Sequence, residues 1–286
     1  MKPEAAPPAA GAADGKDAGT AARTNPGTVA DAAVRANAGT TAGTAAGMNS
    51  GTAAATAAGT TSGSREQPWL LPLLWLSSPA LPIGGFSWSQ GLESGAELGL
   101  IKDEGTLEAY LRGRLRYSLG YWDLPLLKRM YACARAAGLH ALLELNALLL
   151  SGRESAELYR EELCTGRALC RLLESLNLMP RWARGADWGY TAAFALAASA
   201  GAEVPPRQLL EGCAFCWLQN QITAACKCMA IGQTTGQGVL VRLLAPLQHT
   251  VQLALELEDD ELGCSLPASA LSSMLHEHQY SRLFRS

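Results

Sequence analysis

The chain has 286 residues, a formal net charge of -3 at pH 7 and 17% charged residues. This mildly acidic balance argues against a nucleic-acid-binding protein, which would carry a basic patch that the sequence lacks. The eight cysteines are irregularly spaced and follow an N-terminus without an apolar signal core. We therefore interpret them as reduced, buried residues of a cytoplasmic protein rather than as a disulfide framework.

Residues 1–67 consist largely of Ala, Gly and Thr, with near-repeats such as residues 38–47. So few large apolar side chains cannot offset the entropy cost of ordering, which is about 1–2 kcal/mol per residue for the backbone. We therefore predict a disordered tail. A transit peptide is the alternative, but arginine is sparse and Asp14, Asp17 and Asp31 count against it.

The composition changes abruptly at Pro68, where the apolar run 69–76 opens the folded part. Residues 68–286 suffice for one domain with a sizeable core. Their apolar spacing is helical and no hairpin signal occurs, so we predict an all-α, helical-bundle-like domain. No membrane span is predicted, because the best candidates, 188–202 and 212–226, are too short or interrupted by polar residues.

Segment 77–93 crowds two prolines, three glycines and four serines among apolar residues. This composition predicts an ordered loop that leads into a helix near Trp88 and Gln90, with Ser87 or Ser89 as its cap. Its apolar side chains require burial, in the chain's own core or in a partner. They are Leu81, Ile83, Phe86 and Trp88.

The remaining helices are predicted in chain order. The first places Leu107, Leu111 and Leu115 inward and points Arg114 elsewhere, and Asp123 caps the next, which has proline in its first turn. The longest begins at Pro205-Pro206 and ends at the glycine-rich stretch 232–238. The others are predicted over residues 139–150, 155–176, 188–200, 239–244, 248–257 and 267–275.

Four cysteines of the longest predicted helix resemble a four-thiolate zinc site at first sight. Residues ten apart on a straight helix are about 15 Å apart along its axis, so these thiols cannot share one metal ion. Buried structural cysteines are the favoured interpretation. The four are Cys213, Cys216, Cys226 and Cys228.

His276 and His278 are the weak metal candidates. Two imidazoles two residues apart could bind nickel or zinc if the chain were extended or a second subunit completed the shell. We favour a solvated histidine pair near the terminus. For nucleotide binding, stretch 232–238 lacks the Gly-Lys-Ser/Thr ending of a phosphate loop, and no elbow serine or His-Glu-x-x-His occurs.

The C-terminal segment is unusual because a chain end normally frays and is polar, whereas this one is aromatic and carries arginines. Such residues are enriched at protein interfaces. We therefore favour docking on a partner over packing back on the chain's own domain. The residues concerned are Tyr280, Ser281, Arg282, Leu283, Phe284, Arg285 and Ser286.

Three stretches together resemble the UreF-type urease accessory proteins, in the family's order and across residues 68–286. They are the loop, the polar part of the longest helix with the glycines after it, and the C-terminal segment 279–286. The matching residues of the first two are Ser78, Pro79, Pro82, Gly84, Gly85, Phe86, Gln90, Gly91, Glu93, Asn220, Lys227, Gly232 and Gln233.

The resemblance implies an all-α homodimer that is not itself an enzyme and has no cofactor of its own. Members of the family bind a second accessory protein, of the UreD/UreH type, and the nickel-carrying GTPase UreG. The assembly joins apo-urease and helps to deliver nickel, with GTP hydrolysis by the GTPase partner. The family's tail contributes to contact with the UreD/UreH-type protein, which implies the same role for residues 280–286.

Two other functions remain open at this point. One is an all-α metal-binding enzyme that uses the cysteines with His276 and His278. The other is a helical adaptor unrelated to urease.

Overall fold

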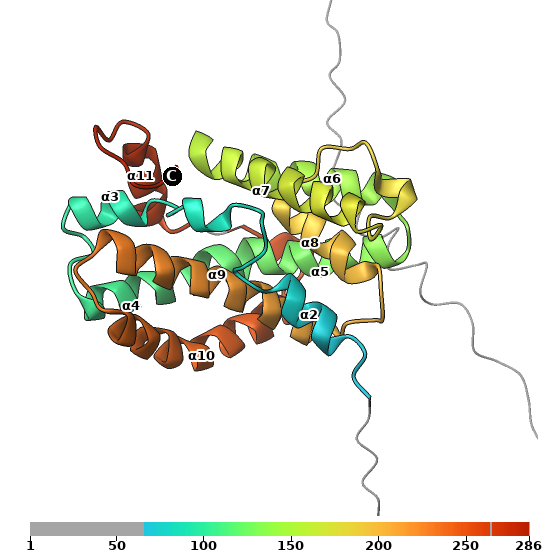
Figure 1. Cartoon of the computed structure of the whole chain (residues 1–286), viewed down its shortest axis with the longest axis horizontal. Coiled ribbons are helices and arrows are strands. Elements are labelled where there is room, and N and C mark those ends of the chain that lie inside the picture. The colour runs from blue at the N-terminus through green and yellow to red at the C-terminus, as the bar shows by residue number, and fades with distance from the viewer. Residues whose placement is uncertain (1–65, 264, 286) are drawn as a thin grey trace, which may run out of the picture. The chain divides into compact units, whose positions relative to one another are not determined.

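The computed structural model describes residues 66–263 and 265–285, and within these ranges it contains helices and no strand (Figure 1). The all-α prediction is confirmed. The predicted tail lies outside the described residues, except for Glu66 and Gln67. The α-helices are α2 (Leu70–Leu76), α3 (Leu92–Glu97), α4 (Glu104–Gly113), α5 (Leu124–Arg135), α6 (Leu139–Ser151), α7 (Ala156–Ser175), α8 (Tyr190–Ser199), α9 (Pro206–Cys228), α10 (Gln233–Glu256) and α11 (Pro267–His276).

Short helical segments of other types connect these helices. The 3-10 helices are η1 (Gly85–Ser87), η3 (Arg181–Ala183) and η4 (Asp259–Glu261), and η2 (Arg114–Asp123) is a π-helix. The predicted helices over 139–150, 155–176, 188–200 and 267–275 agree with α6, α7, α8 and α11 within two residues at each end.

Helix α5 begins at Leu124 with Pro125 in its first turn, as predicted, but α4, η2 and α5 follow one another without a break. The prediction that Asp123 caps α5 is wrong. Asp123 has helical backbone angles and makes no capping hydrogen bond. Pro125 lacks the N–H that would bond to the carbonyl of Tyr121 in an α-helix. Gly263 donates its N–H to that carbonyl instead, at 3.0 Å, so the helical path continues past the proline.

The prediction that the glycine-rich stretch 232–238 separates two helices is wrong for most of that stretch, because α9 ends at Cys228 and α10 already begins at Gln233. The two short helices expected over 239–244 and 248–257 are parts of α10, which has 24 residues against 23 in α9. Interior glycine costs about 1 kcal/mol and proline about 3 kcal/mol in a helix. Buried side chains spaced four residues apart contribute about 1.5–3 kcal/mol each and outweigh that cost. They are Val239, Leu243, Leu247 and Val251.

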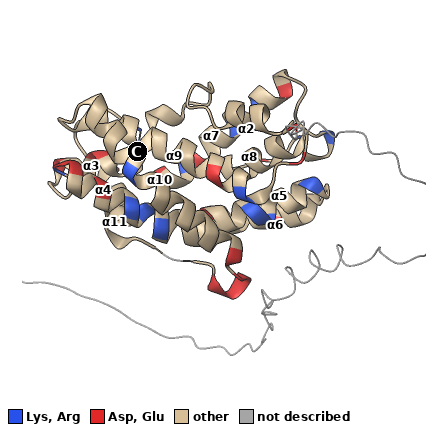
Figure 2. Ribbon diagram, turned by 90° about the horizontal axis from the view of Figure 1, so that it is seen from below, with Lys and Arg blue, Asp and Glu red and all other residues tan. Residues whose placement is uncertain are grey.

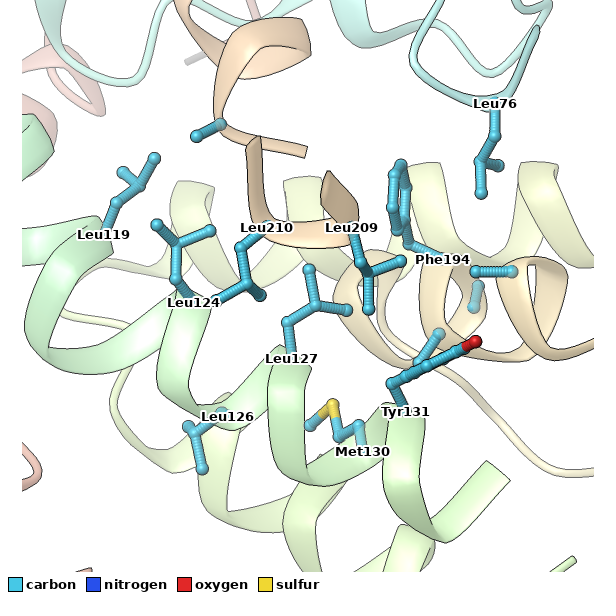
Figure 3. Close-up of a cluster of buried hydrophobic side chains, with 14 of the residues drawn as sticks. Leu76, Leu119, Leu124, Leu126, Leu127, Met130, Tyr131, Phe194, Leu209 and Leu210 are labelled. Atoms are coloured by element: carbon cyan, nitrogen blue, oxygen red, sulfur yellow. The ribbon is translucent and has the colours of Figure 1, made fainter. Parts of the chain in front are cut away.

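The core lies where α5 packs against α8 and α9. Figure 3 shows Leu127 of α5 beside Leu209 and Leu210 of α9, with Phe194 of α8 close by and Met130 of α5 beyond Leu127. All five side chains are fully buried. Helix α8 is rich in alanine, whose side chain is short, so neighbouring helices approach its axis closely, as its composition predicts.

Acidic and basic residues are interspersed along the described ribbon, most of which is neither (Figure 2). One described helix, α10, is long and apolar enough by length and composition to cross a membrane. It packs on α4, α5, α9 and η2 within the fold. Core helices of soluble proteins pass the same test, so this single helix is weak support for a membrane span.

Candidate functional site

The three stretches of the sequence that carry the family resemblance meet at Lys227 on α9. Its ammonium nitrogen lies 5.5 Å from the ring centre of Phe86, in the loop, and 5.7 Å from that of Phe284, in the C-terminal segment. A cation over aromatic rings at this distance is attracted to both. The N–H of Arg285 also donates to the carbonyl of Ser87 at 2.8 Å. Loop, helix and chain end thus form one surface.

The loop enters α3 later than the sequence predicts. The helix begins at Leu92, after Gly91, rather than near Trp88. Gly91 has a φ of +81°, and a Cβ there would lie 2.6 Å from the backbone nitrogen of Ser273, so only glycine fits against α11. The N-cap residue is Gly91, so neither expected cap, Ser87 or Ser89, occupies that position. Ser89 still accepts the N–H of Glu93 in the first turn at 3.4 Å.

Gln90 ties the loop to the interior through four hydrogen bonds. Arg114 donates to its backbone carbonyl at 3.0 Å and to its Oε1 at 2.8 Å, and Trp217 donates to the same Oε1 at 2.8 Å. The Gln90 amide donates to Glu161 at 2.8 Å. These bonds hold Gln90 at a φ of +55°, which a non-glycine residue rarely adopts. Arg114 is buried, so the prediction that it points away from the core is wrong.

A cavity of about 450 Å³ lies next to this network and is lined by both Gln90 and Arg114. On its wall, one guanidinium nitrogen of Arg153 lies 2.6 Å from Asp123 and 2.6 Å from Glu162. Burial lowers the pKa of Arg153, but the two carboxylates outweigh it and raise the pKa above its ordinary value. Glu162 also accepts the N–H of Thr191 at 2.7 Å, which satisfies a free donor at the start of α8.

Glu161, also in the cavity wall, is expected to make the protein less stable as the pH rises. Burial raises its pKa from 4.5 to about 7, against the hydrogen bond from Gln90 and the charge of Arg153. Between these two values the folded state binds more protons than the unfolded state, so stability falls as the pH rises from about 4.5 to 7. Glu161→Gln should abolish this pH-dependent loss of stability. We expect the loss to be about 2 kcal/mol, because the side chain keeps some contact with solvent.

Urea unfolding of both proteins at pH 5.0 and 7.5 measures the effect. The stability of Glu161→Gln relative to the parent should rise between these two pH values. Glu174→Gln, at an exposed position of the same helix, is the matched control. If Glu161→Gln and the parent lose the same stability between pH 5.0 and 7.5, the raised pKa is refuted.

The expected solvated histidine pair is wrong for His276 and correct for His278, which is exposed. His276 is fully buried because α11 packs against α3 and α7, where Glu93 and Glu157 each face one of its ring nitrogens. Neither ring nitrogen points to open space, so the geometry of His276 does not suit a metal ligand.

The C-terminal segment packs back on its own domain in part, which is the alternative that the sequence did not favour. Phe284 is buried and Arg282 pairs with Glu157 at 2.8 Å. Tyr280 and Leu283 remain largely exposed. The structure leaves Ser286 undescribed, and Ser281 and Arg285 are exposed. α11, which leads into the segment beside α3 (Figure 1), adds three exposed apolar side chains, Leu271, Met274 and Leu275.

The other candidate residues take no part in the contacts at Lys227 described above. Asn220 lies against Gly85, where a Cβ would be 3.4 Å from its amide nitrogen, and both line the cavity. Gly232 and Gln233 lie at the start of α10 and make none of the contacts described above. Earlier in the loop, Ser78 accepts the N–H of Ala80 at 3.2 Å. The three remaining candidates of the loop are the exposed Pro79 and Pro82, and Gly84 just before η1.

All four cysteines of the possible zinc site lie along α9, as expected. Burial raises the pKa of each thiol, that of Cys213 well above its ordinary value and that of Cys228 to about 12. Neutral thiols are poor metal ligands. In the part of the chain that the structure describes, no three His, Cys, Asp or Glu residues are placed to hold a metal ion.

The sequence did not reveal the polar residues that hold the loop, the cavity wall and the C-terminal segment. Their side chains are of types common on exposed helix faces, so no local pattern marks them as buried. Only Trp217 carried a signal, as an inward residue of the longest helix. The residues missed are Arg114, Arg153, Glu157, Glu161 and Glu162.

Comparison with known proteins gives consistent matches. A family model described as UreF matches residues 101–244. The urease accessory protein UreF of Chromohalobacter salexigens is 46% identical over 218 residues, covering 76% of this chain and 94% of that protein. The proteins of the same name from Pseudoalteromonas translucida and Psychrobacter cryohalolentis are 44% and 46% identical over 222 residues, each with 76% and 94% coverage.

Proposed function

Since the chain belongs to the UreF family of urease accessory proteins, we propose that it is a non-enzymatic scaffold in the nickel-dependent maturation of urease. It binds a UreD/UreH-type accessory protein and the GTPase UreG, and the assembly joins apo-urease. Nickel is the cargo of this assembly, GTP is bound by the partner, and the scaffold has no resident cofactor. The proposal places the scaffold in the cytoplasm as a homodimer.

The geometry of the C-terminal segment is the observation that supports this proposal most. Its backbone is held on the domain while Tyr280 and Leu283 are exposed. Exposed aromatic and aliphatic side chains on an ordered backbone are suited to docking, because less conformational entropy is lost on binding. We assign this surface to the UreD/UreH-type protein.

Scaffolding also explains how nucleotide state and metal release could be coupled without chemistry on this chain. Coupling requires that the assembled scaffold bind the two nucleotide states of the GTPase with different affinity. The free energy of that difference can then favour release of the metal in one state. Measuring the affinity of the complex for the GTPase with GDP and with a GTP analogue tests this step.

Deleting residues 280–286 should abolish co-purification with the UreD/UreH-type protein and leave the helical circular dichroism intact, because the segment lies outside the helical core. A point variant makes the test sharper. Leu283→Ala should weaken binding at least about 10-fold, as loss of a central apolar contact does. Leu71→Ala on α2 is the matched control, since Leu71 is 75% exposed and Leu283 is 73% exposed.

Full binding by the deletion variant would remove the segment from the interface and with it the main support for this proposal. Equal loss in the Leu283→Ala and Leu71→Ala variants would show a general effect of surface apolarity instead. The alternative of a metal-binding enzyme predicts stoichiometric metal in the purified protein. Elemental analysis distinguishes the two, because the scaffold carries no resident metal.

A further inference from the structure

A carboxylate on α3 accepts two successive backbone N–H groups of the C-terminal segment. Glu93 Oε1 accepts the N–H of Leu283 at 2.7 Å, and its Oε2 accepts the N–H of Phe284 at 3.0 Å. Glu93 is 6% exposed, so these bonds form away from solvent. Hydrogen bonds to an ionised acceptor are about twice as strong as neutral ones. The Glu93 carboxylate therefore attaches the segment through two successive backbone amides.

The same carboxylate also faces His276 at the end of α11. Oε2 of Glu93 lies 3.0 Å from His276 Nε2, and Oε2 of Glu157 lies 2.8 Å from His276 Nδ1. Ionised carboxylates only accept, so the ring satisfies both when both nitrogens carry hydrogen. Arg282 donates to the other oxygen of Glu157 at 2.8 Å.

The buried cluster places two carboxylates, Glu93 and Glu157, against the His276 ring and the Arg282 guanidinium. Burying a charge is costly unless it is paired and hydrogen-bonded, so removal of one member leaves another unpaired. The neighbouring thiol of Cys228 adds no charge, because burial and the charge of Glu93 raise its pKa to about 12.

The segment between the two attachments is short. It begins at the His276 side chain and ends at the Leu283 and Phe284 amides, and all three contact Glu93. Residues 277–282 therefore form a loop closed at both ends on one carboxylate, with the fully exposed Tyr280 within it. Ordering a free segment costs about 1–2 kcal/mol per residue for the backbone, and this attachment meets that cost before any partner binds.

We propose that Glu93 is the positioning residue of the docking segment: it fixes Tyr280 and Leu283 in one arrangement, and His276 and Glu157 hold it in place. This inference rests on the proposed function of the segment and deepens it. The partner is the UreD/UreH-type protein assigned to this surface above.

Hydrogen exchange tests the proposal directly, because two identified amides report on the attachment. In Glu93→Gln the acceptor charge is lost, and the amides of Leu283 and Phe284 should exchange at least about 10-fold faster. The dissociation constant for the UreD/UreH-type protein should rise about 10-fold or more. Glu97→Gln, at an exposed position of the same helix, should change neither quantity.

Arg282→Gln is the second variant, because Arg282 is partly exposed and its loss leaves the helices untouched. It should raise exchange at the same two amides by a smaller factor, through Glu157 and His276. Retained circular dichroism and unchanged exchange in α5 and α9 show that each variant folds. If Glu93→Gln does not fold, exchange of the Leu283 and Phe284 amides in Arg282→Gln still tests the proposal.

Two results would overturn the proposal. One is unchanged exchange of the Leu283 and Phe284 amides in the folded variants. The other is faster exchange with an unchanged dissociation constant, which would make the attachment structural only. The deletion of residues 280–286 separates these outcomes from failure of the proposed function. If the deletion abolishes binding and Glu93→Gln binds as the parent does, only the positioning role is lost.

Discussion

Replacing Arg153 by methionine is expected to lower the free energy of unfolding by about 3–5 kcal/mol. Methionine keeps most of the side-chain length but removes the cation that lies 2.6 Å from both Asp123 and Glu162. The two carboxylates then face each other, largely buried, without a counter-charge. Breaking a buried pair from one side is costly for this reason, even where the intact pair contributes little net stability.

Arg112→Met is the matched control for this variant. Arg112 pairs with Glu108 one turn away on α4 and is half-exposed. An exposed pair of this kind contributes about 0–1 kcal/mol. Urea unfolding followed by circular dichroism at 222 nm measures both variants. If Arg153→Met lowered the free energy of unfolding by less than about 1 kcal/mol, solvent would be stabilising the carboxylates of Asp123 and Glu162 without the arginine, and the prediction would be wrong.

Gly166→Ala is expected to have the second large effect, a loss of about 3 kcal/mol or more or failure to accumulate folded protein. Gly166 lies where α7 crosses the start of α8. A Cβ there would lie 2.3 Å from the Trp188 carbonyl oxygen and 2.6 Å from the Tyr190 nitrogen. Both are backbone atoms, so the methyl group fits only if the two helices separate.

Gly201→Ala tests whether this loss comes from the contact or from glycine itself. Nothing lies within 4 Å of a Cβ at Gly201, and its φ is not positive. Alanine should therefore be neutral or slightly stabilising there, by reducing the entropy of the unfolded chain. Thermal unfolding of the two variants side by side gives the comparison. Similar midpoints for both would contradict the close approach of α7 and α8.

Both large predictions concern the support of the surface proposed for docking rather than the surface itself. Arg153 joins η2 to α7 through Asp123 and Glu162, and Gly166 lets α7 approach the start of α8. Helix α7 also carries Glu161 and Glu157. Glu161 holds Gln90 and so the loop, whereas Glu157 holds His276 and Arg282. A shift of α7 would therefore disturb both attachments together. Partial destabilisation at either position should weaken partner binding as well as the fold.

The sequence alone determined the local features of this protein. Helical spacing, proline and glycine predicted an all-α fold and placed α6, α7, α8 and α11 within two residues. It also placed the four cysteines on one helix, since spacing along a helix is set by its geometry. The family resemblance came from short motifs and needed no fold. These features depend on residues that are close together in the sequence, so they can be predicted without the tertiary structure.

Only the tertiary structure decided which polar side chains are buried and which distant segments meet. A glutamate or arginine on a helix can be solvated as well as buried. Which of the two occurs depends on the element that packs against that face of the helix. For that reason Arg114 and His276 were misplaced, and Glu93 could not be identified as the attachment of a segment about 190 residues away. The continuity of α10 has the same origin, because long-range burial outweighed the local cost of glycine and proline.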